Sequence, residues 1–152
     1  MVSNKIWLFA IIGGWALIAA ASSALEVYRD FAQPERWLDV RSILVSDGDE
    51  SASPRVSIDR TIHKHFLGYW HAAVRKVSDG TNAAVCLADG STGYSPDAQI
   101  PPGATLDWVT QPEKCGLRAG KYRLDILWRI LPDGYPEKRV YRTSNVFEIR
   151  PS

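Results

Sequence analysis

Residues 122–130 read YRLDILWRI, and this stretch carries the clearest secondary-structure signal in the chain. Its apolar residues recur at every second position, at Tyr122, Leu124, Ile126, Trp128 and Ile130. Because successive side chains of a strand point to opposite faces, this period predicts a half-buried β-strand. Asp133-Gly134 predicts a turn after it. The segment 140–149 (VYRTSNVFEI) predicts the returning antiparallel strand, bulged at Ser144-Asn145.

Weaker strand signals precede this hairpin. Segments rich in β-forming or alternating apolar residues lie at 37–45, 56–62, 70–75, 83–87 and 106–108. Turn-forming Asp-Gly pairs and a Pro-rich loop over 91–103 separate them. No helical period occurs after residue 36. We therefore predict an all-β fold, a single antiparallel β-sandwich of about seven strands that covers residues 37–152.

Residues 6–25 (IWLFAIIGGWALIAAASSAL) are an apolar stretch without a charge. As a helix at about 1.5 Å per residue, this stretch extends roughly 30 Å, the thickness of a bilayer core. We therefore predict one N-terminal transmembrane helix, with residues 1–5 in the cytoplasm and residues 26–36 as a juxtamembrane linker. The alternative is a signal peptide cleaved after Ala24, where Ser22-Ser23-Ala24 supplies small residues.

Both interpretations of this N-terminal segment export the rest of the chain. An uncleaved helix predicts a single-pass protein of a bacterial inner membrane, with the β-domain in the periplasm or outside the cell. A cleaved segment predicts a secreted or periplasmic protein instead.

The chain has 152 residues, a formal net charge of +1 and 45% hydrophobic residues, which indicates a folded chain with one main domain. The nearly balanced charge argues against nucleic acid as a partner, since nucleic-acid-binding proteins normally carry a basic excess. No Gly-x-Ser-x-Gly elbow and no Gly-Lys-Ser/Thr phosphate loop occur. The sequence therefore predicts no cofactor and shows no recognisable catalytic set.

The segment 117–124 (LRAGKYRL) resembles the approach to the sixth strand of immunoglobulin-like domains. The resemblance implies that the Tyr122 hydroxyl ties back to the preceding corner, that Leu124 lies in the core, and that Trp70 is a buried tryptophan of an earlier strand. The cysteine pair of that family is absent, because Leu124 stands where the second cysteine would be. The implied fold is a generic immunoglobulin-like or fibronectin type III-like sandwich. The arrangement is also similar to small anchored proteins of unknown role that bacteria and their phages encode.

Cys86 and Cys115 are the two cysteines of the chain, 29 residues apart. In an exported domain an even number of cysteines favours a disulfide. Closing a loop of this length would stabilise the fold by about 3–4 kcal/mol in the chain-entropy treatment. A redox role is not favoured, because the chain has no Cys-x-x-Cys motif.

His63, His65 and His71 are the three histidines of the chain. In an extended segment the first two would point to one face, and His71 would lie opposite its apolar neighbours. Histidines gathered on one polar face could bind zinc or copper. The alternative interpretation is three solvated side chains, and Lys64 between the first two adds a positive charge that opposes a cation.

The tryptophans of the expected β-domain divide into two groups. Trp70, Trp108 and Trp128 fall on positions that we expect to face the core. Trp37 lies close to the N-terminal helix, where it could touch lipid headgroups.

Loops on a rigid sandwich are where binding residues concentrate. We therefore place a candidate binding surface on the Pro-rich loop and on the turn after residue 130, at Tyr94, Pro96, Pro101, Pro102 and Tyr135. The function that we expect is a membrane-anchored, non-enzymatic interaction or structural module with a protein partner, in contact with the bilayer through residues 6–25. Two alternatives are a metal-binding periplasmic protein using the three histidines and a phage-encoded accessory protein of the envelope or virion.

Overall fold

The computed structural model describes the backbone of residues 3–77, 82–111 and 115–152, and in the N-terminal helix the side chains of Trp15 and of residues from Ile18 onward. The chain forms two units, Met1–Ala32 and Gln33–Ser152. The first holds helix α1 (Ser3–Phe31), which includes the predicted helix 6–25. A search of the described residues finds no helix that is long and apolar enough to span a bilayer. Most side chains of 6–25 lie outside the described residues, and its membrane span stays a prediction.

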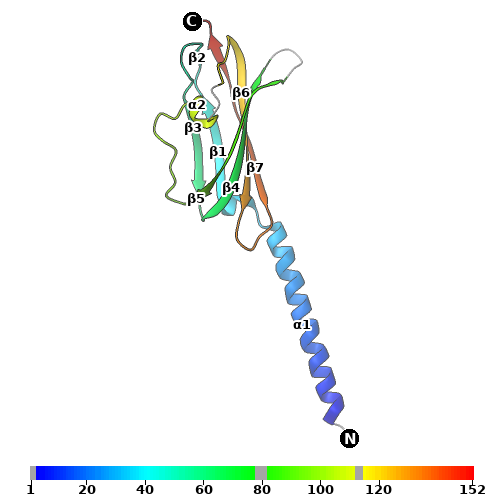
Figure 1. Cartoon of the computed structure of the whole chain (residues 1–152). Helices are drawn as coiled ribbons and strands as arrows, with labels where there is room; N and C mark the ends of the chain where they lie inside the picture. The colour runs from blue at the N-terminus through cyan, green and yellow to red at the C-terminus, as the bar shows by residue number, and fades with distance from the viewer. Residues whose placement is uncertain (1–2, 78–81, 112–114) are drawn as a thin grey trace. The chain divides into compact units, whose positions relative to one another are not determined.

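The second unit begins with a short 3-10 turn, η1 (Pro34–Arg36), and its described part then holds seven strands and one short helix (Figure 1). In chain order the strands are β1 (Leu38–Val45), β2 (Gly48–Asp49), β3 (Val56–Ile62), β4 (Phe66–Lys76), β5 (Ala84–Tyr94), β6 (Gly120–Leu131) and β7 (Lys138–Arg150). The helix, α2 (Leu106–Val109), lies between β5 and β6.

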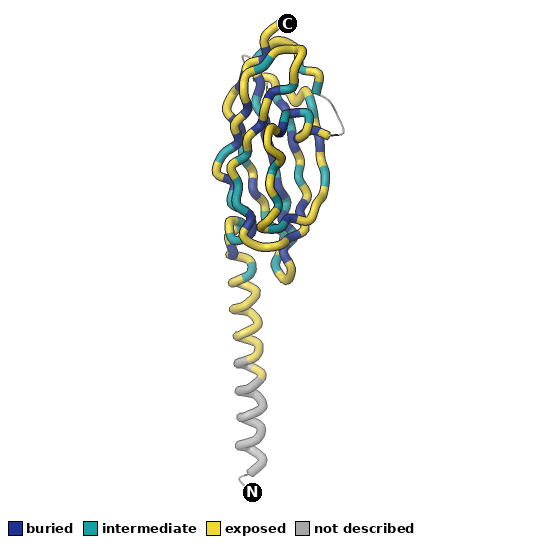
Figure 2. Tube along the Cα trace, turned by 90° about the vertical axis from the view of Figure 1, so that its left-hand side faces the viewer, coloured by how far each residue is buried: buried dark blue, intermediate teal, exposed yellow. Residues whose placement is uncertain are grey.

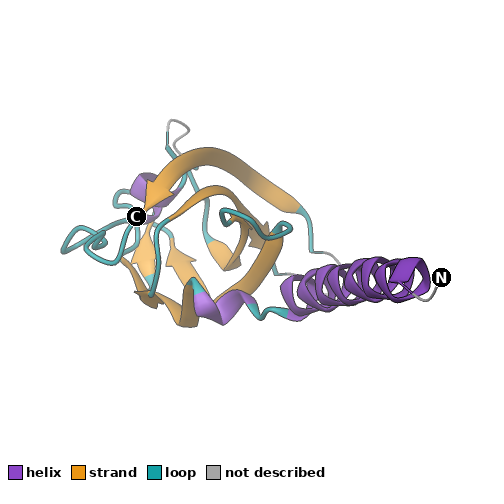
Figure 3. Cartoon of the chain, turned by 90° about the horizontal axis from the view of Figure 1, so that it is seen from below, coloured by secondary structure: helices purple, strands orange, loops and turns teal. Residues whose placement is uncertain are grey.

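The strands form two sheets that curve around a shared core (Figure 3). One sheet has five strands in the order β2-β7-β6-β4-β5, antiparallel except for the short parallel pair of β2 with β7. The other is the antiparallel pair β1-β3. A mostly-β fold with two sheets is therefore confirmed, and it is compatible with the predicted sandwich.

Two parts of the predicted secondary structure are wrong. Residues 106–108 are not a strand but part of helix α2, since Leu106 and Val109, three residues apart, both turn into the core. Alternation over only two apolar positions could not separate these two structures. Asp89-Gly90 and residues 91–94 belong to β5 rather than to the predicted turn and loop, because they continue the antiparallel pairing with β4.

The two sheets meet along one side through side chains rather than through backbone pairing. The Asn145 amide on β7 bridges to β1, accepting from the Val45 N–H at 2.8 Å and donating to the Val45 carbonyl at 2.9 Å. Farther along the same seam, Arg142 Nε donates to the Val40 carbonyl at 2.7 Å. On the opposite side the edge strands β3 and β5 are not paired with each other.

The core follows the period of two that the sequence predicts for β6. Alternate residues of this strand are buried, at Tyr122, Leu124, Ile126, Trp128 and Ile130. Figure 2 shows the alternation of buried and exposed positions along the strands. The Tyr122 hydroxyl donates to the Arg118 carbonyl at 2.7 Å, as the immunoglobulin-like resemblance implied, and Leu124 is fully buried.

The tryptophans follow the prediction only in part. Trp128 is buried as expected, but Trp70 is half-buried and Trp108 is 39% exposed because it lies on α2. Trp37 is 4% exposed, and its ring meets Tyr135 edge-on at 4.9 Å between centroids. The expected contact of Trp37 with lipid is therefore wrong, since its side chain is buried in the β-domain.

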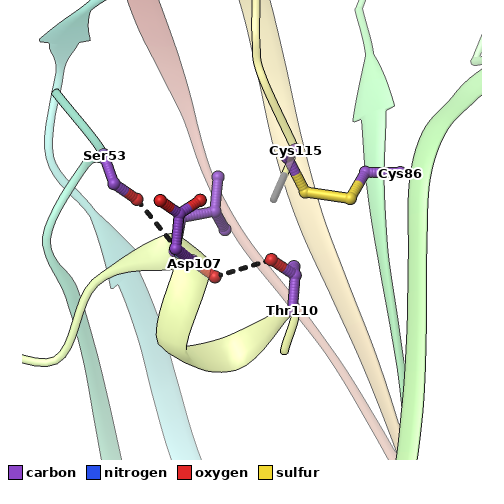
Figure 4. The surroundings of a disulfide bond; sticks show 6 residues. Ser53, Cys86, Asp107, Thr110 and Cys115 are labelled. Carbon is purple, nitrogen blue, oxygen red and sulfur yellow. Dashed lines mark hydrogen bonds between the residues drawn. A yellow bond between two sulfur atoms is a disulfide. The ribbon is translucent and has the colours of Figure 1, made fainter. Parts of the chain in front are cut away.

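The predicted disulfide is present, and it joins Cys86 on β5 to Cys115 with 5.5 Å between their Cα atoms. Figure 4 shows helix α2 beside this bond. The Asp107 N–H donates to Ser53 Oγ at 3.0 Å, and the Thr110 hydroxyl donates to the Leu106 carbonyl at 3.1 Å. The first bond satisfies a backbone N–H in the first turn of the short helix. The second adds to the backbone bond of 2.9 Å that the Leu106 carbonyl already accepts from the Thr110 N–H.

Candidate binding site

The loop between β5 and α2 runs beside strand β3 (Figure 1). Residues of the loop and of the strand line a groove of about 820 Å³. Most of β3 forms one wall, and the loop residues Pro96, Ala98 to Ala104 form the other. We term this hollow the β3 groove. Its charged lining residues among those described are Arg55 and Arg60, and no carboxylate lines it.

A smaller hollow of about 340 Å³ adjoins the β3 groove, because the two share Ile58, Arg60, Ala98 and Gln99. We term it the Arg60 cavity. It lies at the open side of the fold, where β3 and β5 are not paired, and strands β3 to β6 and helix α2 all contribute to its lining. Arg60 is the charged residue of this lining in the described part of the chain.

The Arg60 side chain reaches into the cavity from β3 without a carboxylate partner in the described part of the chain. Its Nε atom is buried and makes no hydrogen bond there. The guanidinium carbon lies 5.4 Å from the centre of the Tyr94 ring. Burial lowers the pKa of Arg60, and the Tyr94 hydroxyl opposes this shift. Arginine nevertheless stays charged in proteins, so the cavity holds a cation whose hydrogen bonding is incomplete.

Tyr94 lies at the end of β5, directly opposite Phe66 on β4. The two rings stack at 4.7 Å between centroids, with an angle of 11° between their planes. Burial raises the pKa of the Tyr94 hydroxyl, and the charge of Arg60 together with hydrogen bonds from Trp128 and Arg60 opposes this rise. Because a phenol hydroxyl carries its own proton, Tyr94 can also donate a hydrogen bond.

Two glycines make room for the aromatic walls. A Cβ atom on Gly90 would lie 2.7 Å from the Trp70 ring, and one on Gly68 would lie 2.8 Å from the Tyr94 ring. Gly90 is the cross-strand partner of Trp70. Any larger residue at these positions would push the rings away, so the glycines fix where the cavity walls lie.

The structure brings several of the predicted binding residues together. Tyr94 lines the Arg60 cavity, and Pro96, Pro101 and Pro102 line the β3 groove. Tyr135 is elsewhere, because it lies in the β6–β7 connection with its ring against Trp37. The Pro-rich loop of the predicted surface therefore belongs to the site, and the turn after residue 130 does not.

Sequence reasoning missed Arg60, although the sequence holds a signal for it. The inward positions of β3 are Val56, Ile58, Arg60 and Ile62, so a charged residue interrupts an otherwise apolar face. A charge at such a position must find a partner or face a polar hollow. Which of the two applies depends on residues far away in the sequence.

The three histidines do not form one site. His63 and His65 are exposed in the connection between β3 and β4, and His71 is exposed on β4 itself. At about 3.3 Å per residue, His71 lies roughly 17 Å along the strand from its start. In the part of the chain that the structure describes, no group of three or more His, Cys, Asp or Glu could hold a metal ion.

Comparison of the chain with protein-family models, with curated proteins and with solved structures finds no match in any of the three. The site is therefore interpreted from its own chemistry.

Proposed function

We propose that the β-domain is a non-enzymatic binding module that takes a carboxylate-bearing ligand on Arg60. The single observation that carries the proposal is the buried Nε of Arg60, which has no hydrogen-bond partner among the described residues. An unsatisfied buried donor typically costs about 1–3 kcal/mol. A carboxylate would offset this cost, because it forms charge-assisted, paired hydrogen bonds with a guanidinium.

The remaining walls define the rest of the ligand. Trp70, Trp108 and Trp128 surround the Arg60 cavity and offer aromatic surface to an apolar body. Ligand sites of this size class typically combine apolar walls with a few convergent polar groups. Tyr94 and Gln99 supply polar groups beside Arg60. This chemistry supports binding rather than proton transfer, since arginine neither gains nor loses a proton near neutral pH.

Part of this proposal is that the module works outside the cytoplasm. The Cys86–Cys115 bond supports it, because disulfides persist mainly in oxidising compartments. The apolar stretch 6–25 supports it from the sequence, either as a membrane anchor in contact with the bilayer or as a cleaved leader.

The test is a titration of the full chain with phenylacetate, followed by tryptophan fluorescence. Phenylacetamide is the matched uncharged probe. We expect phenylacetate to bind at least about tenfold more tightly, the ratio that one charge-assisted hydrogen bond provides. In Arg60→Met this preference should vanish, while the fold persists because an apolar side chain relieves a buried charge.

Arg55→Met is the control variant, because Arg55 is an exposed arginine on the same wall of the β3 groove. It should keep the preference for phenylacetate. Equal binding of the two probes by the unmodified chain would contradict the proposal.

A further inference from the structure

The outer edge of β3 begins a backbone pairing that it does not complete. The Val56 N–H donates to the Ala104 carbonyl at 2.8 Å, and the Leu106 N–H donates to the Pro54 carbonyl at 2.8 Å. These two bonds flank an antiparallel bridge between Arg55 and Thr105. Beyond this bridge the loop leaves the strand and forms the far wall of the β3 groove.

Alternation along a strand fixes which backbone groups face this edge. The backbone N–H of Val56 points to the outer edge of β3. The backbone N–H and C=O groups of Ile58, Arg60 and Ile62 therefore point to the same edge. The backbone groups of the alternate residues point to the other edge and pair with β1. The hydrogen bond of 2.9 Å from the His63 N–H to the Trp37 carbonyl shows this alternation. No backbone group in the described part of the chain pairs with the outward groups of these three residues.

The loop that forms the far wall is poorly suited to complete this pairing itself. Pro96, Pro101 and Pro102 carry no backbone N–H, and three such residues interrupt any continuous ladder. The edge therefore stays open to a strand from another molecule. Strand addition to an open sheet edge is a common mode of peptide recognition.

Side chains along the same edge specify which peptide would fit. Ile58 and Ile62 lie two residues before and after Arg60, and all three side chains face the interior. In an antiparallel pair the side chains directly opposite each other lie about 4.5–5.5 Å apart at their Cβ atoms. A glutamate opposite Arg60 would thus place its carboxylate at the guanidinium, with apolar residues opposite the two isoleucines.

We infer that the β3 groove receives an extended peptide that pairs antiparallel with β3 through Ile58, Arg60 and Ile62. The peptide carries an acidic residue opposite Arg60, flanked at two residues on either side by apolar ones. Charge complementarity supports this occupant, because the described lining holds two arginines and no carboxylate. The inference rests on the proposed function and names the ligand class of the same site.

The experiment compares three blocked peptides on the full chain. The first is TVTETVT, the second is TVTQTVT, and the third is TVTETVT with an N-methyl group on the glutamate amide. Glutamate should bind at least about tenfold more tightly than glutamine, since it forms charge-assisted hydrogen bonds with Arg60. In Arg60→Met the glutamate and glutamine peptides should bind equally. N-methylation should lower affinity by a similar factor, since it removes one bond of the ladder and blocks close approach of the strands.

Amide hydrogen exchange locates the peptide. On binding of TVTETVT, the amides of Ile58, Arg60 and Ile62 should become protected. The amides of Ser57, Asp59 and Thr61 should change little, because they already face β1. Equal binding of the methylated peptide, or no added protection at the three outward amides, would overturn the inference.

Two further outcomes separate this inference from the proposed function. Binding of phenylacetate without binding of TVTETVT would overturn the peptide and leave the carboxylate site standing. Failure of both probes would remove the site altogether. If the free chain is a dimer in sedimentation and its outward amides are already protected, a second copy of this chain occupies the edge and the peptide inference is wrong.

Discussion

Arginine side chains on the sheets of this domain differ in the partners that they meet. Arg41 pairs with Asp59 and Arg129 pairs with Glu137, each at 2.6 Å between nitrogen and oxygen. Arg60 instead lies in an aromatic cavity with no carboxylate among the described residues. The Arg41–Asp59 pair is exposed, and such pairs contribute little to stability. Arg60 is therefore the arginine on which we propose that the ligand binds, because its hydrogen bonding is incomplete.

Glu137 is a carboxylate that pairs with two arginines, and this pairing lowers its pKa. Hydrogen bonds from Arg129 and Arg139 lower its pKa from 4.5 to about 2. A group whose pKa is lower in the folded state stabilises the fold above its unfolded pKa, and this contribution is lost as the pH falls toward the folded pKa.

We therefore predict that Glu137→Gln flattens the loss of stability of the chain between about pH 4.5 and pH 2. At pH 7 the variant should be less stable than the unmodified chain, and the two should converge near pH 2. Urea unfolding at a series of pH values measures this difference. Glu148→Gln is the control, since Glu148 is an exposed carboxylate on β7, the strand that follows Glu137 in the chain. If the unfolding free energy of both variants depends on pH in the same way, the ion pairs of Glu137 do not contribute to the pH dependence of stability.

The backbones of β1 and β7 lie next to each other without forming a ladder. Asn145 replaces that ladder locally, because its amide side chain imitates the donor and acceptor of a neighbouring strand. The sequence predicted only a bulge at Ser144-Asn145. That Asn145 closes the seam between two sheets depends on where Val45 of β1 lies, 100 residues earlier in the chain.

We predict that Asn145→Ala lowers the free energy of unfolding by about 1–3 kcal/mol, because it strips the partners from the N–H and C=O of the buried Val45. Denaturant unfolding measures the change. Asn82→Ala is the matched control, since its exposed side chain makes no hydrogen bond to the described residues. Equal stability of the two variants would show that the seam closes without the amide bridge.

At the scale of the whole molecule, the disulfide encloses the segment that builds the far wall of the β3 groove. The loop from Pro96 to Ala104 and helix α2 both lie between Cys86 and Cys115. An unbridged chain would gain conformational entropy over this entire segment when it unfolds. The bond therefore acts on the fold and on the site together.

We predict that the double variant Cys86→Ser, Cys115→Ser loses about 3–4 kcal/mol of unfolding free energy relative to the oxidised chain. Equilibrium denaturation under non-reducing conditions measures this loss. A reducing agent should destabilise the unmodified chain and leave the double variant unchanged, which separates loss of the bond from effects of the substitutions. A double variant that unfolds at the same denaturant concentration as the oxidised chain would contradict the prediction.

The sequence by itself determined what depends on neighbouring residues. The pattern of apolar residues predicted β1, β3, β6 and β7 and parts of β4 and β5, because alternation records which face of a strand is buried. Cysteine parity predicted the disulfide, and the proline content predicted a loop over residues 91–103, of which 95–103 are a loop in the structure. Only the tertiary structure decided the rest. The pairing order of the strands, the open edge of β3 and the isolation of Arg60 all depend on which distant residues become neighbours. An arginine on an apolar strand face is visible in the sequence, but the absence of a carboxylate around it among the described residues is a property of the folded chain.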